Sequence, residues 1–195
     1  MSNIFLISDT HFNEYDGPNS VVRLFHRPFK NSMEMNRKII ENWNSVVKSD
    51  DIVFSLGDFA HLSEDMVKYA SQLNGKIVFV LGNHDFEGDR KWMGRTNFQD
   101  AWFPLTGILT YKNKDFLLAH SPDDVPYWWR GWVIHGHHHI RPQFPFIDGK
   151  KRNINVASDL VDFTPVSLDW IYSLNLDGIK RMERKNSIPM RWERD

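Results

Sequence analysis

The sequence predicts a mixed α/β protein in which two sheets pack face to face with helices outside. The first half alternates short apolar runs with amphipathic stretches, a pattern typical of parallel strands joined by right-handed crossovers. The second half carries mostly short strands, two of which flank a hairpin turn at 112–114. A length of 195 residues suits one compact domain and is short for two.

The first half alternates strands with helices. Three apolar runs have the length and β-branching of buried strands: 3–8, 51–56 and 76–81. Two stretches carry apolar residues at helical spacing: 32–47 and 63–73. Ser32 and Ser63 are their candidate N-caps, and Gly75 follows the second helix. Residues 12–31 hold Gly17, Pro18 and Pro28 among mixed polar residues, so we expect a long loop there.

The second half is expected to form a series of short strands: 107–111, 115–119, 132–135, 143–147, 152–156 and 166–168. We place a single domain at 1–176. Residues 177–195 are dense in charge of both signs, so we expect a solvated surface tail, with an interface role as the alternative.

Composition excludes several classes of protein. Hydrophobic residues make up 41% and charged residues 25%, which rules out a disordered chain, a coiled coil and a collagen-like repeat. Lys and Arg number 24 against 25 Asp and Glu, so binding of polymeric nucleic acid through a strongly basic field is not favoured. The absence of cysteine excludes disulfides and thiolate metal sites.

The N-terminus lacks a basic segment before its first apolar run, and Asp9 interrupts that run early. We therefore expect no signal peptide. No apolar stretch approaches the ~20 residues that cross a bilayer. These features predict a cytoplasmic protein with no membrane partner; the sequence leaves its oligomeric state open.

Chemically active side chains follow five of the predicted strands. They are Asp9 and His11, then Asp58, then Asn83 with His84 and Asp85, then His120, then a histidine-rich run at 135–139. Because ligands bind at the carboxyl ends of strands in open α/β sheets, we expect these side chains to converge on one crevice. We expect His135 and His138 to be structural or to support the ligands from behind, with a ligand role as the alternative for His138.

The donor set predicts two metal ions. It consists of Asp9, His11, Asp58, Asn83, His120, His137 and His139. Carboxylate, imidazole and amide donors without sulfur suit Mn, Fe, Zn or Ni. Seven donors exceed what one ion needs, but they suit two ions about 3.5–4 Å apart that share a bridging carboxylate.

Local sequence supports this convergence. In Asp9-Thr10-His11 and in 137–139 the outer residues would point the same way if the backbone were extended. Glycines at 57, 82 and 136 would let the backbone turn tightly beside the ions.

Taken in order, Asp-x-His, Gly-Asp, Gly-Asn-His-Asp, a later His and Gly-His-x-His, from Asp9 to His139, resemble the calcineurin-like metallophosphoesterase superfamily. Smaller motifs resemble a compact bacterial and phage branch of predicted phosphoesterases: Arg27-Pro28-Phe29, Trp43-Asn44 and Leu56-Gly57-Asp58-Phe59. The resemblance implies a four-layer α/β/β/α sandwich, with two mixed sheets flanked by helices. Two positions depart from the pattern: Ala119 stands where Gly often occurs, and His138 where Thr or Ser often occurs.

The resemblance also implies roles for individual residues. One ion would be held by Asp9, His11, Asp58 and His139. The other would be held by Asp58, Asn83, His120 and His137, with Asp58 bridging. His84 would face the substrate phosphate and protonate or stabilise the leaving oxygen, oriented by Asp85.

The expected activity is hydrolysis of a phosphomonoester or phosphodiester, with nucleotides among the candidates, by attack of a hydroxide that bridges two divalent ions. Mn is the first choice of metal, with Fe, Zn or Ni as alternatives. The rival enzyme is a nucleotide pyrophosphohydrolase. The rival of another class is a non-catalytic binding scaffold on the same fold, like the retromer subunit that resembles these enzymes.

Substrate contacts are expected from Arg27, as a phosphate clamp, and from Asn83. A solvated surface arginine is the alternative for Arg27. Specificity is expected in three loops: 12–31, 86–104 and 121–132. The tryptophans between 128 and 132 are expected to pack in the core or a lid, with stacking on a nucleobase as the alternative.

Overall fold

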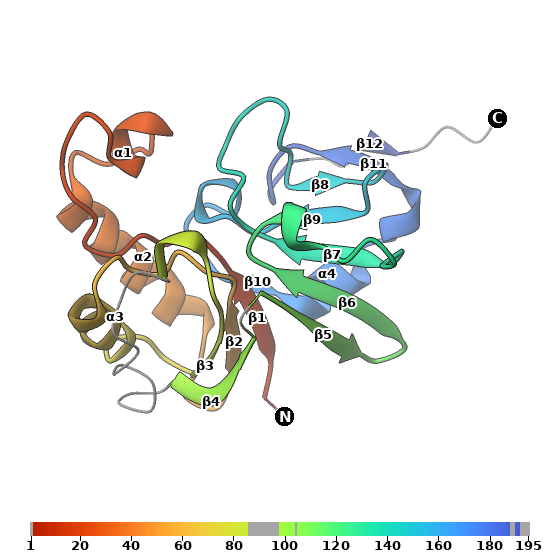
Figure 1. The fold of residues 1–195 in the computed structure, drawn as a ribbon, viewed down its shortest axis with the longest axis horizontal. Coiled ribbons are helices and arrows are strands. Elements are labelled where there is room, and N and C mark those ends of the chain that lie inside the picture. Colours follow the sequence, from red (N-terminus) through yellow and green to blue (C-terminus); the bar gives the residue numbers. More distant parts are fainter. Residues whose placement is uncertain (1, 86–97, 104, 188–189, 192–195) are drawn as a thin grey trace.

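The first sheet contains five strands and is mostly parallel. A computed structural model describes residues 2–85, 98–103, 105–187 and 190–191. The strands are β1 (Ile4–Ile7), β2 (Ile52–Ser55), β3 (Lys76–Val80), β4 (Phe98–Phe103) and β10 (Val166–Ser167). Their order is β10-β1-β2-β3-β4 (Figure 1). Strands β1 to β4 are parallel neighbours, whereas β10 pairs with β1 in the antiparallel sense.

Three helices lie to one side of this sheet (Figure 1). They are α1 (Val21–Leu24), α2 (Ser32–Val46) and α3 (Ser63–Ala70), and α1 interrupts the predicted loop 12–31. Helix α2 buries Met35, Ile39 and Trp43, whose spacing places them on one face of the helix. Its N-cap is Asn31, whose side chain accepts a hydrogen bond from the Glu34 N–H, so the prediction of Ser32 as the cap is wrong by one residue. A fourth helix, α4 (Leu168–Ser173), contacts β1 and β10.

The second sheet is mixed and contains seven strands. They are β5 (Thr106–Tyr111), β6 (Lys114–Ala119), β7 (Trp132–His135), β8 (Ile147–Asp148), β9 (Asn153–Asn155), β11 (Ile179–Met182) and β12 (Met190–Arg191). Their order is β12-β11-β8-β9-β7-β6-β5. Strands β6, β7 and β9 are parallel neighbours at its centre. The predicted hairpin joins β5 to β6, with Tyr111 opposite Lys114.

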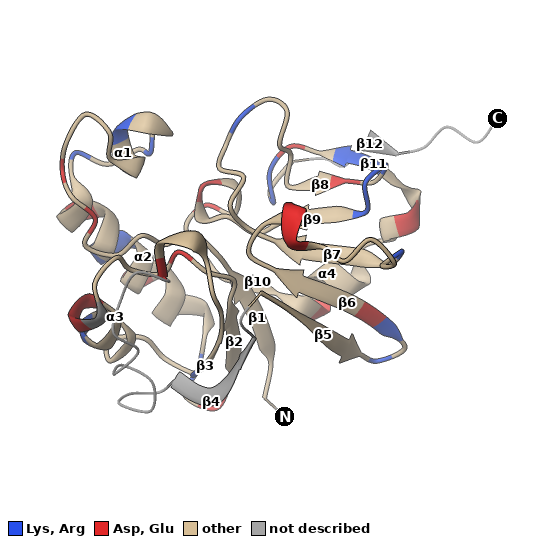
Figure 2. Ribbon diagram, in the orientation of Figure 1, with Lys and Arg blue, Asp and Glu red and all other residues tan. Residues whose placement is uncertain are grey.

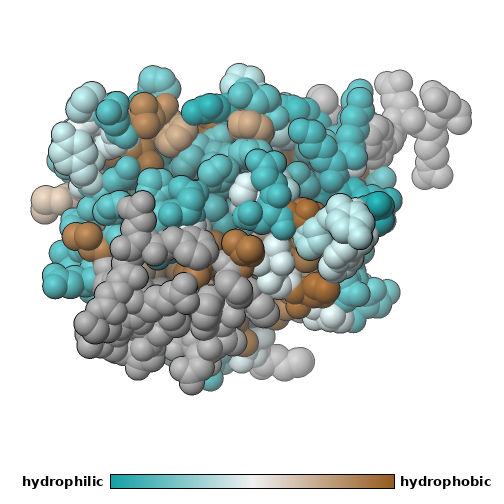
Figure 3. All heavy atoms as spheres, in the orientation of Figure 1, coloured by the Kyte–Doolittle hydropathy of each residue, from teal (hydrophilic) through white to brown (hydrophobic). Residues whose placement is uncertain are grey.

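One hydrophobic core joins the two sheets. It includes Leu6 and Val53 from the first sheet with Phe116 and Ile134 from the second, all buried. The predicted fold class, a mixed α/β protein with two mixed sheets and helices, is confirmed. Among the described residues, the face drawn in Figure 3 is mostly hydrophilic, with hydrophobic side chains in small separate groups. Among the described helices, none combines the length and apolar character needed to cross a membrane.

Several predicted elements differ from the structure. Strand 143–147 is wrong for most of its length, because a turn closed by a bridge between Arg141 and Phe144 precedes the short β8. The strand at 166–168 belongs to the first sheet, as β10. Within the region predicted as a loop at 86–104, residues 98–103 form β4, while 86–97 and 104 lie outside the described residues.

The segment predicted as a charged tail begins with a strand of the second sheet. Strand β11 pairs with β8 and β12, and Ile179 and Met182 on it are buried. The sequence pattern did not predict this strand, because Ile179 and Met182 stand among charged neighbours. Both side chains pack in the hydrophobic core and anchor the strand there. The described part of 177–195 is therefore integrated in the fold rather than a free surface tail.

Candidate metal centre

Six strand ends meet at the candidate site. Strands β1, β2 and β3 are parallel neighbours in the first sheet, and β6, β7 and β9 are parallel neighbours in the second, so their carboxyl ends share an edge. A bridge between Ser8 and Ala157 joins the two edges. There the Ser8 N–H donates to the Val156 carbonyl at 3.0 Å, and the Ser158 N–H donates to the Ser8 carbonyl at 2.9 Å.

The predicted ligands form two groups at this edge. One group is Asp9, His11 and His139; the other is Asp58, His120 and His137. Within each group the potential ligand atoms lie within 4.8 Å of one another. Five of these six residues are buried, so the first group is shielded from bulk water, whereas the second is partly open at His137. The structure thus brings together side chains separated by more than a hundred residues of sequence.

Asp58, a member of the second group, also approaches the first. Its Oδ2 is 3.8 Å from His11 Nε2 and 3.5 Å from His120 Nε2. Asn83 belongs to the second group, because its Oδ1 is 2.9 Å from His120 Nε2 and 3.0 Å from His137 Nδ1. This arrangement places one carboxylate within reach of both halves of the site and the amide within reach of one.

The donor atoms fit divalent cations. Asp9 Oδ1 and His11 Nε2 are buried and have no hydrogen-bond partner among the described residues. Buried polar atoms are ordinarily paired, so unpaired ones facing a cluster of carboxylates and imidazoles call for a ligand. A borderline metal ion suits oxygen and imidazole nitrogen donors of this kind.

Four of the candidate ligands have left-handed backbone conformations. Their φ angles are 57° at Asp9, 48° at His11, 51° at Asp58 and 64° at His137. The expectation of an extended backbone through 9–11 and 137–139 is therefore wrong, although the outer residues of each triplet do face the site. Such conformations cost about 1–3 kcal/mol each and persist where surrounding structure holds them.

The surrounding structure does hold them. The Asp9 N–H donates to the Gly57 carbonyl at 3.0 Å, and the His11 N–H donates to the Asp58 carbonyl at 3.0 Å. Thr10, between them, is fully buried and its hydroxyl donates to the Phe59 carbonyl. These bonds join the loop at 9–11 to the loop at 57–59, so each loop holds the backbone of the other in place.

Two glycines allow the carboxylates to approach the backbone closely. A Cβ on Gly82 would lie 2.2 Å from Asp58 Oδ1, and a Cβ on Gly136 would lie 2.3 Å from Asp9 Oδ2. Any side chain at either position would displace a candidate ligand, which explains why glycine is needed there.

Electrostatics in the site couple Asp58 to His120. Burial opposes charge on both, but their mutual contact outweighs it, so the pKa of Asp58 is lowered and the pKa of His120 is raised to about 9. Burial lowers the pKa of His11 well below its ordinary value. Burial likewise lowers the pKa of His135 to about 3, which keeps that ring neutral in the interior.

Comparison with known proteins decides the family. The family model described as the calcineurin-like phosphoesterase superfamily domain matches residues 2–156. The chain belongs to the calcineurin-like phosphoesterase superfamily. It is also 40% identical over 181 residues to an uncharacterized protein of Methanocaldococcus jannaschii, covering 89% of this chain and 92% of the relative.

A solved structure shares the superfamily fold. The crystal structure of a protein of unknown function from Aquifex aeolicus matches with a TM-score of 0.66 and 24% sequence identity. The match covers 88% of this chain and 98% of the other. At this identity the likeness concerns the fold alone.

In this superfamily member, His84 stands at the mouth of the metal centre. Its backbone N–H donates to Asp58 Oδ1 at 2.9 Å, which ties it to the shared carboxylate. Its side chain is about half exposed, and its Nε2 lies 4.0 Å from Asp58 Oδ2. The ring therefore stands beside the donors while remaining accessible to a ligand in the cavity.

Asp85 does not orient the His84 ring as expected. Its buried carboxylate instead accepts three backbone N–H bonds, from Asp58 at 2.7 Å, Gly82 at 2.8 Å and Phe59 at 3.1 Å. Burial and then the charge of Asp58 raise the pKa of Asp85 to about 7. Asp85 is thus a clamp on the two loops that carry Asp58 and Asn83.

Replacing Asp85 with Asn tests this clamp. One amide oxygen replaces two carboxylate oxygens, so backbone N–H groups lose partners at about 1–3 kcal/mol each. We expect Asp85→Asn to lower the free energy of unfolding of the metal-free protein, measured in urea, by about 1–3 kcal/mol for each N–H group that loses its partner. The exposed Asp115→Asn is the matched control. Unchanged stability of Asp85→Asn would show that the three bonds are not needed.

Arg27 is not placed as a phosphate clamp. Its side chain is fully buried, and its Nε lies 2.6 Å from Asp159 Oδ1. Asp159, which the sequence reasoning missed, follows β9 in the turn Ser158–Leu160, and its Oδ2 lies 2.8 Å from His139 Nδ1. Its position just after an apolar strand is the same signal that identified Asp9 and Asp58.

A cavity of about 440 Å³ opens onto the metal centre. The predicted loop 12–31 contributes Glu14, Asn19 and residues of the α1 segment to its lining. The turn before β8, which was missed, contributes Arg141 and Phe144. The lining residues are His11, Glu14, Asn19, Val21, Leu24, Phe25, Asp58, Asn83, His84, His137, His138, His139, Arg141 and Phe144.

The aromatic rings of the cavity stack on histidines. Phe25 stacks on His139 and Phe144 stacks on His138, each with ring centroids 3.8 Å apart. The loop 121–132 does not contribute to this described lining. Trp132 is buried in the core, as the packing interpretation expects, whereas Trp128 is exposed elsewhere on the surface.

Proposed function

We propose that this protein is a dimetal-dependent phosphoesterase that hydrolyses a phosphomonoester or phosphodiester, with Mn as the first choice of metal. The observation that carries the proposal is the position of Asp58 Oδ2, which lies 3.8 Å from His11 Nε2 of one group and 3.5 Å from His120 Nε2 of the other. One ion would be held by Asp9, His11, Asp58 and His139, and the other by Asp58, Asn83, His120 and His137. When bound, such a pair of ions lowers the pKa of a shared water and neutralises phosphate charge.

The protein's own residues would do the rest. His84, beside the donors and open to the cavity, is suited to give a proton to the leaving oxygen. Gly82 and Gly136 let the carboxylates of Asp58 and Asp9 lie close against the backbone. Asn83, which also lines the cavity, is suited to contact the phosphate.

The cavity favours a small phosphoester over a nucleic-acid polymer. Among the described residues, acidic and basic positions are interspersed over both halves of the fold (Figure 2), an arrangement that does not favour the phosphate backbone of a polymer. Apolar side chains in the cavity lining suit a leaving group that carries a ring, such as a nucleotide; they are Val21, Leu24, Phe25 and Phe144.

The test is a metal-reconstituted activity screen. Metal-free protein is loaded with Mn, Fe, Zn or Ni and assayed on bis-p-nitrophenyl phosphate, p-nitrophenyl phosphate and a nucleotide panel. Turnover of the first substrate marks a diesterase, and turnover of the second a monoesterase. Release of a nucleotide together with a second phosphate compound would instead identify the rival pyrophosphohydrolase. Metal binding without turnover of any substrate would favour the scaffold.

Arg141 provides a prediction about the leaving group. It is a permanent cation on the lining, and its guanidinium carbon lies 5.5 Å from the centre of the Phe25 ring. Some substrates carry a negative charge on the leaving group, which the Arg141 guanidinium would attract. For such a substrate, we expect Arg141→Gln to raise KM about 10- to 100-fold with kcat nearly unchanged.

The matched comparison uses a substrate whose leaving group carries no charge before cleavage, and a distant arginine. Arg141→Gln should change KM for bis-p-nitrophenyl phosphate less than about threefold, and the exposed Arg37→Gln on α2 should change neither. An equal rise in KM for both substrates would show that Arg141 does not discriminate between leaving groups.

A further inference from the structure

A buried chain of charges extends outward from one metal ligand. His139 Nδ1 lies 2.8 Å from Asp159 Oδ2, and Asp159 Oδ1 lies 2.6 Å from Arg27 Nε. All three residues are buried. Burying an ion pair of this kind costs free energy, because both charges lose their hydration. Its position next to a candidate ligand therefore suggests a function at the metal centre.

Arg27 also holds the backbone of a second ligand of the same group. Its Nη2 donates to the Asp9 carbonyl at 2.8 Å, and its Nη1 donates to the Met35 sulfur at 3.1 Å. The Ser158 hydroxyl donates to the same Asp9 carbonyl at 2.8 Å. One arginine therefore contacts both the carboxylate behind His139 and the strained turn that presents Asp9.

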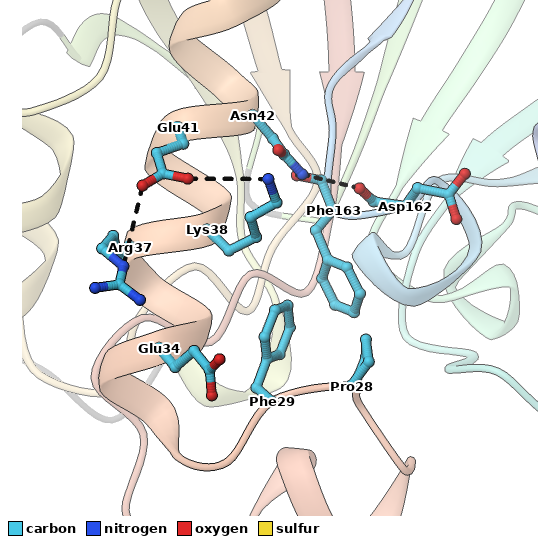
Figure 4. Close-up of a pocket in the computed structure, with 9 residues that line it drawn as sticks. All are labelled: Pro28, Phe29, Glu34, Arg37, Lys38, Glu41, Asn42, Asp162 and Phe163. Atoms are coloured by element: carbon cyan, nitrogen blue, oxygen red, sulfur yellow. Dashed lines mark hydrogen bonds and ion pairs between the residues drawn. The ribbon is translucent and has the colours of Figure 1, made fainter.

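The motif Arg27-Pro28-Phe29 keeps this arginine in place. The Arg27 guanidinium lies 5.6 Å from the centre of the Phe163 ring, and Phe163 meets Phe29 edge-on at 4.8 Å. Figure 4 shows both rings side by side with Pro28, at the wall of a cavity of about 480 Å³ beside α2. Phe29 of the motif thus packs against the ring that the Arg27 guanidinium contacts, which holds the arginine in position.

The other group of ligands is supported differently. His120 Nδ1 lies 2.8 Å from the Leu56 carbonyl, a neutral acceptor. A carboxylate and a carbonyl both accept only, so in each histidine Nδ1 carries the proton and Nε2 is left for the metal. A carboxylate behind a histidine raises the basicity of the ligand more than a carbonyl does. The two halves of the centre therefore differ in the charge of the group behind one histidine.

We propose that Asp159 and Arg27 are positioning residues that set the metal affinity of the half formed by Asp9, His11 and His139. Asp159 orients the His139 ring so that Nε2 stands 3.6 Å from Asp9 Oδ1, and Arg27 fixes Asp159 and the Asp9 backbone together. This inference rests on the proposed dimetal function, and it goes beyond it by assigning residues that touch neither metal nor substrate.

The experiment measures each half separately by calorimetric titration with Mn²⁺. In a His120→Ala background only the Asp9, His11 and His139 group is intact; in a His139→Ala background only the other group is intact. Adding Asp159→Asn should weaken Mn²⁺ binding about 10- to 100-fold in the first background and less than about threefold in the second. Arg27→Met should act like Asp159→Asn, and Arg27→Lys should recover part of the loss.

Two controls separate positioning from general damage. Asp162→Asn, three residues away with its carboxylate bonded to Asn186, should leave both affinities unchanged. The double variant Arg27→Met, Asp159→Asn leaves no unpaired buried charge, so it remains testable if a single variant fails to fold. It should keep the same selective loss of Mn²⁺ affinity.

The outcomes are distinguishable. Wild-type protein that binds no Mn²⁺, Fe²⁺, Zn²⁺ or Ni²⁺ would overturn the proposed function and this inference together. Wild type that binds two ions while Asp159→Asn keeps both affinities would overturn the inference alone. Equal loss in both backgrounds, or wild-type affinity in the double variant, would also overturn it, because the pair would then act on folding or through an unpaired charge.

Discussion

Asp58→Asn should empty both halves of the metal centre. The amide is a weaker, uncharged ligand, and Asp58 Oδ2 stands within reach of His11 on one side and His120 on the other. Loss of the shared carboxylate should therefore lower the metal content at both sites and reduce kcat/KM by on the order of 10³-fold or more. Elemental analysis of protein purified in the presence of Mn²⁺, with parallel assays, measures both quantities.

The control for this variant is Asp50→Asn. Asp50 is exposed in the turn before β2, at the opposite end of that strand from Asp58, and its substitution should leave metal content and turnover unchanged. If Asp58→Asn lost one ion and kept the other at wild-type affinity, Asp58 would belong to a single half of the centre and the bridging role would be wrong.

His84→Ala should keep the metals and lose catalysis selectively. His84 is tied to Asp58 through its backbone N–H, which alanine retains, so the donors stay in place. The missing ring removes a proton donor, which costs about 10²–10⁴-fold on alkyl phosphoesters, whose leaving groups need a proton. Esters of p-nitrophenol, whose leaving group is stable as an anion, should lose much less.

The comparison for His84→Ala is His61→Ala. His61 is exposed, and its ring centre lies 6.0 Å from that of His84, but it is not among the described residues that line the cavity. It should leave both activities unchanged. Full activity of His84→Ala on an alkyl phosphoester would remove His84 from the mechanism.

The candidate ligands could be predicted because their signal is local. Each follows a short apolar run, and strand ends in parallel sheets share an edge whatever the rest of the chain does. The order of the motifs then supplied the pairing of Asp58 with both groups as an expectation. The backbone at these ligands could not be predicted, since the left-handed turns at Asp9 and Asp58 are imposed by bonds between loops about fifty residues apart.

The roles of Arg27 and Asp85 show the same limit. Arg27 lies in the loop after the first ligand block, which suggested a contact with substrate, and Asp85 adjoins His84, which suggested a contact with that ring. Their actual partners are Asp159, distant in sequence, and three backbone N–H groups that no sequence pattern displays. Whether a charged side chain faces a ligand or a buried partner depends on what packs against it.

The sequence by itself determined the alternation of strands and helices, the superfamily and the donor types, because hydrophobic periodicity and side-chain chemistry are properties of short stretches of chain. Only the tertiary structure decided which strands join which sheet, that β11 completes the second sheet, and that Asp159 stands behind His139. These depend on contacts between distant segments, whose free energy comes from burying surfaces against each other and leaves no trace in the local pattern.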